Sequence, residues 1–170
     1  IDPNNADIIW AGTLGFRGVY RSVDAGLTWE KRTNGIVENL QLTLRGFAIE
    51  PGNSNVVYAA GDIDLGKRTW YNATKGVVYK TVDAGLNWQA VWRGDNVARY
   101  VLIDPTNVNT LYVSTGIWDR EAANSDLAAN IPGGVGVLKS TDAGATWTTV
   151  NNGLENLYVF GSLDANSALY

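Results

Sequence analysis

The strongest constraint on the fold of this chain is an eight-residue segment that occurs three times. It reads SVDAGLTW at 22–29, TVDAGLNW at 81–88 and STDAGATW at 140–147, so successive aspartates are 59 residues apart. We call each copy a box. Repetition with a long fixed period is typical of arrays, solenoids and propellers, in which every repeat is one supersecondary unit. The sequence therefore predicts a repeated architecture.

Short segments rich in β-branched and aromatic residues surround every box. Each repeat opens with a Pro or Pro-Gly turn, at 2–5, 50–53 and 104–107, followed by a strand, a loop of variable length and a second strand that enters the box. A third strand begins at the box Trp, and a fourth leads to the next Pro turn. Such residues favour strands, and Pro presets φ in tight turns. Four short antiparallel strands per repeat predict an all-β fold, a β-propeller of four-stranded blades.

The repeats divide the chain into about three blades of one propeller segment, 1–170. Their approximate limits are 1–43, 44–96 and 97–156, and 157–170 begins a further blade. Propellers close with roughly four to eight blades, and the chain starts at Ile1 and has no Met. We therefore expect a partial propeller, completed by blades of a longer protein or, as the less favoured option, by other copies. Two stacked β-sandwiches are the alternative, but they give no reason for three similar units.

Composition excludes several kinds of chemistry. The sequence has no Cys and no His, which removes thiolate nucleophiles, zinc–sulfur sites and Ser–His catalysis. We expect neither a metal nor a cofactor. Acidic residues exceed basic ones, 17 to 13, and there is no basic run, which argues against a nucleic-acid partner. No apolar run approaches the roughly 20 residues that span a bilayer, so no membrane span is expected.

A stapled hairpin turn is the simplest interpretation of the box. Gly permits positive φ, and the Asp carboxylate can accept backbone N–H groups across the turn. The polar side chains at the first and seventh positions add hydrogen bonds, and the box Trp, like Trp10 and Trp92, is expected in the core. We assign the box aspartates to structure rather than to catalysis or calcium binding. The structural set is Ser22, Asp24, Gly26, Trp29, Thr81, Asp83, Gly85, Trp88, Ser140, Asp142, Gly144 and Trp147.

The pattern S-x-D-x-G-x-T-W between two strands resembles the Asp-box, or BNR, repeat, and the resemblance covers essentially the whole chain. Proteins with this repeat include sialidases, xyloglucan-cleaving glycoside hydrolases, sortilin-type receptors and a photosystem II assembly factor. The stretches D-P-x-N-x-x-x-(L/V)-Y are most similar to the xyloglucanase and sortilin-like branch, and the Arg-Ile-Pro signature of sialidases is absent. The resemblance implies a β-propeller whose boxes lie away from the active site, and it leaves the function open.

The strand plan also separates two faces of the propeller. In an up-and-down sheet the Pro turns and the boxes lie on one face, and the loops of variable length lie on the other. These loops, 13–17, 61–75 and 114–134, differ in length, and functional residues concentrate on variable loops held by a rigid scaffold. We expect the binding face there. The third loop includes an Ala-rich stretch, 120–130, in which one or two helical turns are expected.

Candidate ligand-binding residues lie on these loops and near the start of the innermost strands. Arg45 and Arg99 each stand six residues before the Pro of a Pro turn, so both should point the same way at the mouth of a central channel. They suit carboxylate or sulfate groups; pairing with an acidic residue, Asp62, Asp95 or Asp119, is the alternative. Loop tryptophans suit stacking on a sugar ring, or else pack against their own loops. The full set is Arg45, Asp62, Asp64, Arg68, Trp70, Tyr71, Arg99, Trp118, Asp119 and Arg120.

Three functions are compatible with these features. The first is an exported binding or scaffold propeller, extracellular or periplasmic, for a glycan or protein partner. The second is a glycoside hydrolase of xyloglucanase-like type, which needs two carboxylates roughly 5 to 10 Å apart. Its candidates are Asp62, Asp64, Asp95, Asp119 and Glu121, with none assigned as acid or base. The third is a structural subunit whose open sheet edges are closed by other copies. Whether the protein is an enzyme stays open.

Overall fold

The computed structural model describes residues 1–14, 18–37, 42–64, 74–94, 96–116 and 135–155, together with 157 and 159. Within these residues the regular secondary structure consists of strands alone. The stretch 120–130, in which helical turns are expected, lies outside them. The strands are β1 (Ile9–Gly12), β2 (Val19–Ser22), β3 (Glu30–Lys31), β4 (Leu42–Glu50), β5 (Asn53–Asp64), β6 (Thr74–Thr81), β7 (Gln89–Gly94), β8 (Val97–Asp104), β9 (Asn107–Gly116), β10 (Val137–Ser140) and β11 (Thr148–Thr149).

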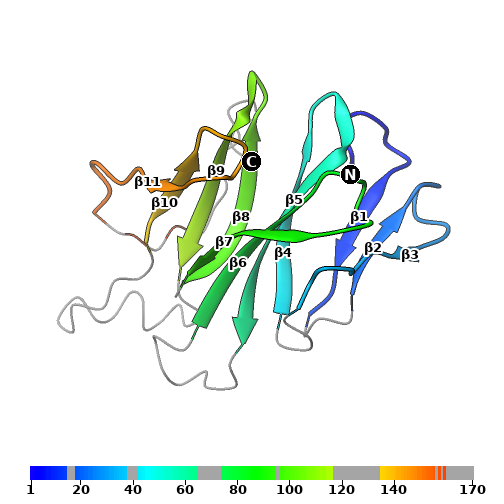
Figure 1. Ribbon diagram of the computed structural model, residues 1–170, viewed down its shortest axis with the longest axis horizontal. Coiled ribbons are helices and arrows are strands. Elements are labelled where there is room, and N and C mark those ends of the chain that lie inside the picture. Colours follow the sequence, from blue (N-terminus) through cyan, green and yellow to red (C-terminus); the bar gives the residue numbers. More distant parts are fainter. Residues whose placement is uncertain are drawn as a thin grey trace.

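The strands form three antiparallel sheets that follow one another along the chain (Figure 1). The first sheet has the order β1-β2-β3, the second β4-β5-β6-β7, and the third β8-β9-β10-β11. Every hydrogen-bonded neighbour is also a neighbour in sequence, so each sheet is a plain meander. The Pro turns join β4 to β5 and β8 to β9, and the boxes join the next two strands of each sheet. The all-β prediction and its order of strands are confirmed.

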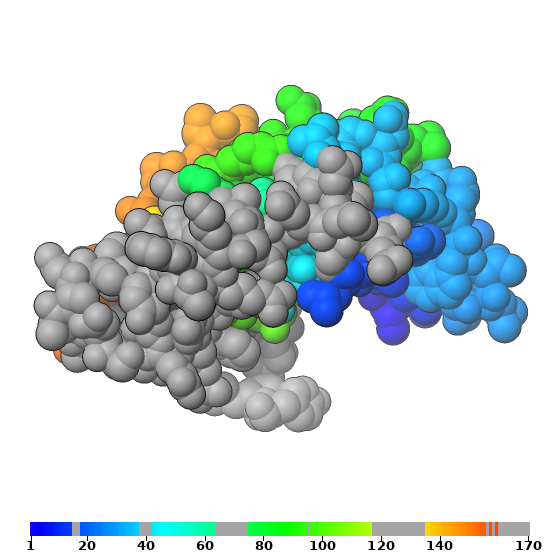
Figure 2. Space-filling view, turned by 90° about the horizontal axis from the view of Figure 1, so that it is seen from below, coloured from blue at the N-terminus to red at the C-terminus, as the bar shows by residue number. Residues whose placement is uncertain are grey.

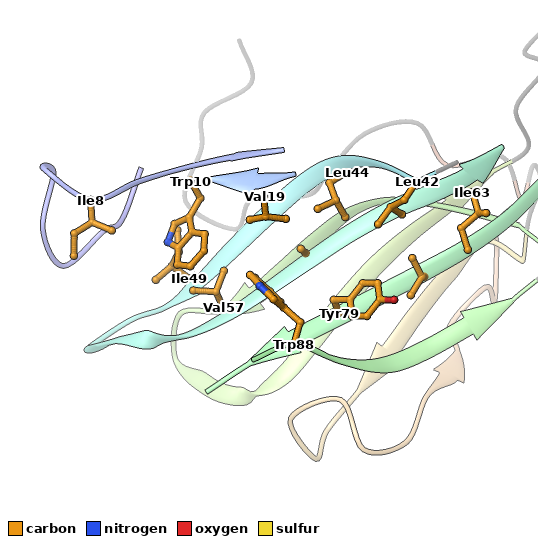
Figure 3. Close-up of a cluster of buried hydrophobic side chains, with 12 residues drawn as sticks. Ile8, Trp10, Val19, Leu42, Leu44, Ile49, Val57, Ile63, Tyr79 and Trp88 are labelled. Carbon is orange, nitrogen blue, oxygen red and sulfur yellow. The ribbon is translucent and has the colours of Figure 1, made fainter. Parts of the chain in front are cut away.

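The middle sheet is buried on both faces, because each neighbouring sheet covers one of them. Side chains alternate across a strand, and on β5 Val57, Ala59 and Ile63 face the first sheet. They pack with Trp10, Val19, Leu42, Leu44, Tyr79 and Trp88, as Figure 3 shows. The alternate residues of β5, Val56, Tyr58 and Ala60, face the third sheet and pack with Val101, Leu111, Val113 and Leu138. Two apolar layers therefore hold the three sheets together.

The strand directions give the molecule two structurally distinct ends. The Pro turns and the boxes lie at one end, which we call the turn end. The other, which we call the loop end, is where β1, β5 and β9 finish and β2, β6 and β10 begin (Figure 1). Figure 2 looks onto the loop end, where the sheets succeed one another from blue at the N-terminal side to orange at the C-terminal side. The sequence placed the variable loops at this end.

Each box forms the same stapled turn, as predicted from its residues. In the first box, Ser22 Oγ donates to Asp24 Oδ1 over 2.7 Å, and the Thr28 backbone N–H and hydroxyl donate to the two Asp24 oxygens over 2.9 and 2.5 Å. The second and third boxes repeat this set on Asp83 and Asp142. The Gly has positive φ in each box, and so does the Ala before it, with φ of 55 to 57°. That Ala was not anticipated from the sequence.

The expectation that all three box tryptophans lie in the core is wrong for the first one. Trp88 is 4% exposed and Trp147 is partly buried against the apolar layer of the third sheet, whereas Trp29 is 44% exposed. The reason is that a box Trp is covered by the sheet that precedes its own. The indole N–H of Trp88 donates to Arg32 O over 3.0 Å, and that of Trp147 donates to Val91 O over 3.1 Å. Among the described residues, no other sheet covers Trp29 in this way.

Candidate functional site

The described residues include three of the predicted ligand-binding side chains, and they come together at the loop end. These are Arg45 on β4, Asp62 on β5 and Arg99 on β8. Asp64 is the last residue of β5. The other predicted residues, Arg68, Trp70, Tyr71, Trp118, Asp119 and Arg120, lie outside the described residues, as do Asp95 and Glu121. We call Arg45, Asp62 and Arg99 the arginine cluster.

Both arginines occupy a β-bulge at the same place in an innermost strand. On β4, Leu44 pairs with Gly61 and Gly46 with Ala60, so Arg45 has no opposite residue. On β8, Ala98 pairs with Thr115 and Tyr100 with Ser114, which leaves Arg99 in the same position. A bulge inserts one unpaired residue into a strand and re-aims its side chain. The two arginines, which stand at the same distance from a Pro turn in the sequence, therefore also stand at the same position of their strands, the bulge.

Arg45 binds Asp62 with two hydrogen bonds across the β4–β5 pair. Arg45 Nε donates to Asp62 Oδ1 over 2.5 Å, and Nη2 donates to Oδ2 over 3.2 Å. The Asp62 side chain has 0% of its surface exposed, while that of Arg45 keeps 29%. Bidentate pairing fixes the plane of a guanidinium. Of the two interpretations of Arg45, pairing with Asp62 is what the structure shows, and part of the Arg45 side chain stays exposed to solvent.

Arg99 adds a second positive charge beside the same carboxylate. A Cβ placed on Gly46 would lie 3.2 Å from the carbonyl oxygen of Arg99, so β4 and β8 are in close contact beside their bulges. Burial raises the pKa of Asp62 above its ordinary value, and the hydrogen bonds from Arg45 and the charges of Arg45 and Arg99 oppose that rise. Asp62 is therefore a buried carboxylate that two arginines stabilise in its charged form.

A hollow of about 450 Å³ lies along the inner edges of the same two strands, nearer to the turn end. It was not anticipated from the sequence. Its lining includes consecutive residues of β4 and β8, and Ile49, Val101 and Ile103 of this lining also belong to the apolar layers. The lining residues are Ile1, Pro3, Gly46, Phe47, Ala48, Ile49, Pro51, Tyr100, Val101, Leu102 and Ile103.

Other kinds of site find no support in the part of the chain that the structure describes. No three acidic side chains among the described residues come together in a way that could hold a metal ion. Across the same residues, no helix has the length and apolar character required to cross a membrane.

Consecutive antiparallel meanders, one of three strands and two of four, packed face to face, define a β-propeller, and the three sheets are its blades. No family model matches the chain. Among curated proteins, the chain is similar to xyloglucanase Xgh74A of Acetivibrio thermocellus, with 26% identity over 196 aligned residues. That match covers 100% of this chain and 21% of the relative. The chain thus spans about a fifth of the length of the xyloglucanase.

Solved structures give the same architecture. An ancestral GH74 enzyme superposes with a TM-score of 0.63 and 22% identity, covering 88% of this chain and 17% of that one. The GH74 xyloglucanase of Xanthomonas campestris gives 0.56 and 20%, covering 88% and 20%. YCF48 bound to a D1 peptide gives 0.56 and 13%, covering 85% and 37%. These similarities establish the β-propeller fold of the chain.

Proposed function

We propose that this chain is part of a glycoside-hydrolase-related β-propeller, built on Asp-box repeats, whose loop end binds a polysaccharide of the xyloglucan type. The observation that carries the proposal is the arginine cluster at the loop end of the two innermost strands. The match of the whole chain to a xyloglucanase supports xyloglucan as the ligand class. Because such a polymer is met outside cells, the proposal includes export of the protein.

Arg45 and Asp62 have different roles in this proposal, because their side chains are exposed to different extents. The Arg45 side chain is 29% exposed and Asp62 is 0% exposed, so a ligand can reach the Arg45 side chain but not the carboxylate. A guanidinium presents several N–H donors in one plane, which suits the hydroxyl groups of a sugar. Asp62 holds that plane in place beforehand, so less conformational entropy is lost when a ligand binds. Arg45 is the proposed contact residue, and Asp62 positions it.

Hydrolysis is the second candidate, and the pKa of Asp62 is the observation in its favour. Burial raises that pKa, as it does for carboxylic acids that protonate a leaving group in glycosidases. Asp62 is nevertheless enclosed and held by Arg45, so a substrate would reach it only after Arg45 moved. The geometry therefore supports binding better than catalysis by Asp62. A peptide ligand is the third possibility, because one solved neighbour is a peptide complex.

Isothermal titration with a xyloglucan oligosaccharide tests the binding proposal. The Arg45→Met variant keeps the aliphatic stem and removes the donors, and we expect it to weaken binding at least tenfold, about 1.4 kcal/mol. Lys31→Met is the matched control, because exposed Lys31 on β3 lies away from the arginine cluster. A reducing-sugar assay on the same polymer separates hydrolysis from binding: sugar release that Asp62→Asn abolishes would establish the hydrolase. Binding of an acidic peptide but not of the oligosaccharide would replace the glycan with a peptide.

A further inference from the structure

The contacts between neighbouring blades follow one plan. We call the contact of the first blade with the second the first junction, and that of the second blade with the third the second junction. In each, the box Trp of the later blade donates its indole N–H to a carbonyl of the earlier one. The pairs are Trp88 with Arg32 O, at 3.0 Å, and Trp147 with Val91 O, at 3.1 Å. Arg32 and Val91 are therefore equivalent positions of the two junctions.

In the second junction, the polar groups of the earlier blade bond directly to the later one. Tyr58 Oη and Lys80 Nζ both donate to the carbonyl of Ala143 in the third box, each over 3.0 Å. Tyr58 and Lys80 are opposite each other on β5 and β6, with the ammonium 5.2 Å from the ring centre. Val91 adds an apolar contact, since a Cβ on Gly144 would lie 3.4 Å from Val91 Cγ2. The second junction therefore has one cation, and that cation has an acceptor.

The first junction has an arginine at both of the corresponding positions. Trp10 and Arg21 are opposite each other on β1 and β2, as the Tyr–Lys pair is in the next blade, and the guanidinium carbon lies 5.7 Å from the Trp10 ring centre. A Cβ on Gly85 would lie 3.2 Å from Arg32 Cβ and 2.6 Å from the Trp10 ring. Trp10 packs edge to face against Trp88 of the second blade (Figure 3). Both arginines therefore lie beside Trp10 on the face that the second blade covers.

The hydrogen-bonding capacity of these two arginines is largely unused among the described residues. The Nε atoms of Arg21 and Arg32 are both buried there without a hydrogen-bond partner, and so is the Trp10 indole nitrogen. The Arg21 side chain makes no hydrogen bond or ion pair with a described residue. Arg32 makes one, from Nη2 to Glu30 Oε2 over 2.6 Å. Buried polar groups are normally hydrogen-bonded, so the first junction lacks an acceptor that the second junction has.

Glu30 is the one side-chain acceptor that bonds either arginine, and it is weakly held. Its side chain is 68% exposed, while that of Arg32 is 14% exposed. Glu30 lies directly opposite Arg21 on the β2–β3 pair, so its carboxylate stands near both arginines. Burial and the charge of Arg32 lower the pKa of Arg21, and the charges of Asp2 and Glu30 raise it. An ion pair with an exposed partner contributes little, so a stronger acceptor can displace Glu30.

We propose that Arg21 and Arg32 bind a tetrahedral oxyanion, phosphate or sulfate, in the first junction, and that Glu30 takes the place of this anion when none is bound. Each guanidinium presents a planar fork of N–H donors, which matches two oxygens of such an anion. An anion also offsets the charge of two neighbouring cations, which a water molecule does not. The proposal involves no residue of the arginine cluster, so it holds independently of the proposed function.

Isothermal titration with inorganic phosphate, at an ionic strength held constant with sodium chloride, tests this proposal. We expect saturable binding that Arg21→Met and Arg32→Val each weaken at least about tenfold, the loss of charge-assisted hydrogen bonds. Arg32→Val introduces the residue that the second junction has at this position, so the fold accommodates it. Glu30→Gln should tighten binding about threefold, because it removes the competing carboxylate. Circular dichroism confirms that each variant is folded.

Two control variants locate the bound anion. Lys139→Met removes an equal charge at the position that Arg21 has in the first blade, opposite Tyr112 on β9, and should leave the affinity unchanged. Arg45→Met removes a guanidinium from the arginine cluster and should also have no effect. A parallel titration with glucose 6-phosphate shows whether the oxyanion is free or part of an ester, by which of the two binds more tightly. Phosphate that does not bind overturns the proposal. So does an affinity that Arg21→Met and Arg32→Val leave unchanged, or one that only Arg45→Met lowers.

Discussion

Asp62 and Gly116 occupy equivalent positions in successive blades. Each pairs with the residue two places before a bulged arginine, Asp62 with Thr43 on β4 and Gly116 with Val97 on β8. The second blade therefore has a carboxylate where the third has none, and Asp62 lies in the fields of both Arg45 and Arg99. Asp62 is thus a single buried negative charge beside two positive ones, so we expect the arginine cluster to be most sensitive to its removal.

Asp62→Asn should lower the free energy of unfolding by about 3 kcal/mol, because it leaves the guanidinium of Arg45 without its charged partner in a largely enclosed place. Asp7→Asn, at an exposed position in the turn before β1, should change it by less than about 0.5 kcal/mol. Urea unfolding at neutral pH measures both. Equal effects of the two substitutions would show that the pair contributes no more than a surface charge.

Arg45→Met should make stability depend on pH in a defined direction. Without Arg45, the pKa of Asp62 rises further above the value of about 3.9 that it has when unfolded. A group with a raised folded pKa contributes stability that is present below the unfolded pKa and is lost as the pH rises through the folded pKa. The melting temperature of Arg45→Met should therefore drop more between pH 4 and pH 7 than that of Lys31→Met. Parallel profiles would contradict this.

The box aspartates should make stability fall at low pH, which is the opposite of the effect expected from Asp62. Hydrogen bonds from Thr28, Asn87 and Thr146, with those from the first box residue, hold the pKa of Asp24, Asp83 and Asp142 at about 2, below the ordinary 3.8. Their stabilisation is complete above pH 3.8 and is lost as the pH falls toward 2. Asp83→Asn should lower stability at pH 6 and make it less dependent on pH between 4 and 2. Acid titration followed by circular dichroism measures this change.

Trp147→Phe should lower the free energy of unfolding by about 2 kcal/mol, because the variant loses two hydrogen bonds and part of its buried ring. Those bonds go to Val91 O and Gly144 O. Trp29→Phe should cost less than about 0.5 kcal/mol, since Trp29 is 44% exposed. Chemical denaturation measures both. A larger cost for Trp29→Phe would refute the role of the preceding blade in burying the box Trp.

Two glycines should respond to Ala for different reasons. A Cβ on Gly76 would collide with the carbonyl oxygen of Asn96 and lie 2.6 Å from the Ala98 nitrogen, so Gly76→Ala should destabilise by about 3 kcal/mol. Gly52 has φ of 81° and nothing within 4 Å of such a Cβ, so Gly52→Ala should cost only about 1 kcal/mol of backbone strain. A thermal melt of each variant checks the order; the reverse order would mean that β6 and β8 are not tightly apposed at Asn96.

Much of the fold follows from the sequence because the repeat fixes strand order and the turn residues fix strand ends. The sequence could not predict, however, which neighbouring sheet Val56 and Val57 of β5 each face. A strand buried on both faces has no polar side that would distinguish them. The shared position of Arg45 and Arg99 was visible in their spacing from Pro51 and Pro105. The bulges were not recognised, although each shifts the alternation by one residue: Leu42 and Leu44 face the first sheet before Arg45, and Phe47 and Ile49 face it afterwards.

The partnership of Arg45 with Asp62 was one of several pairings that the sequence allowed, and only the β4–β5 register selects it. The placement of Trp29 was missed for a different reason. Its box matches the other two residue by residue, but the carbonyl that covers a box Trp belongs to the preceding blade, and no local pattern records that dependence. The candidate residues at Trp70 and Trp118 remain predictions.

The acceptor at each junction is a main-chain carbonyl, carried by Arg32 in one blade and by Val91 in the next. A main-chain acceptor makes no demand on the side chain attached to it, so the two residues can differ without any compensating change in the Trp that binds them. A contact of this kind between neighbouring blades does not depend on which blades they are. Duplicating, exchanging or inserting a whole blade brings its own Trp and its own carbonyl, and the neighbours already have the matching groups.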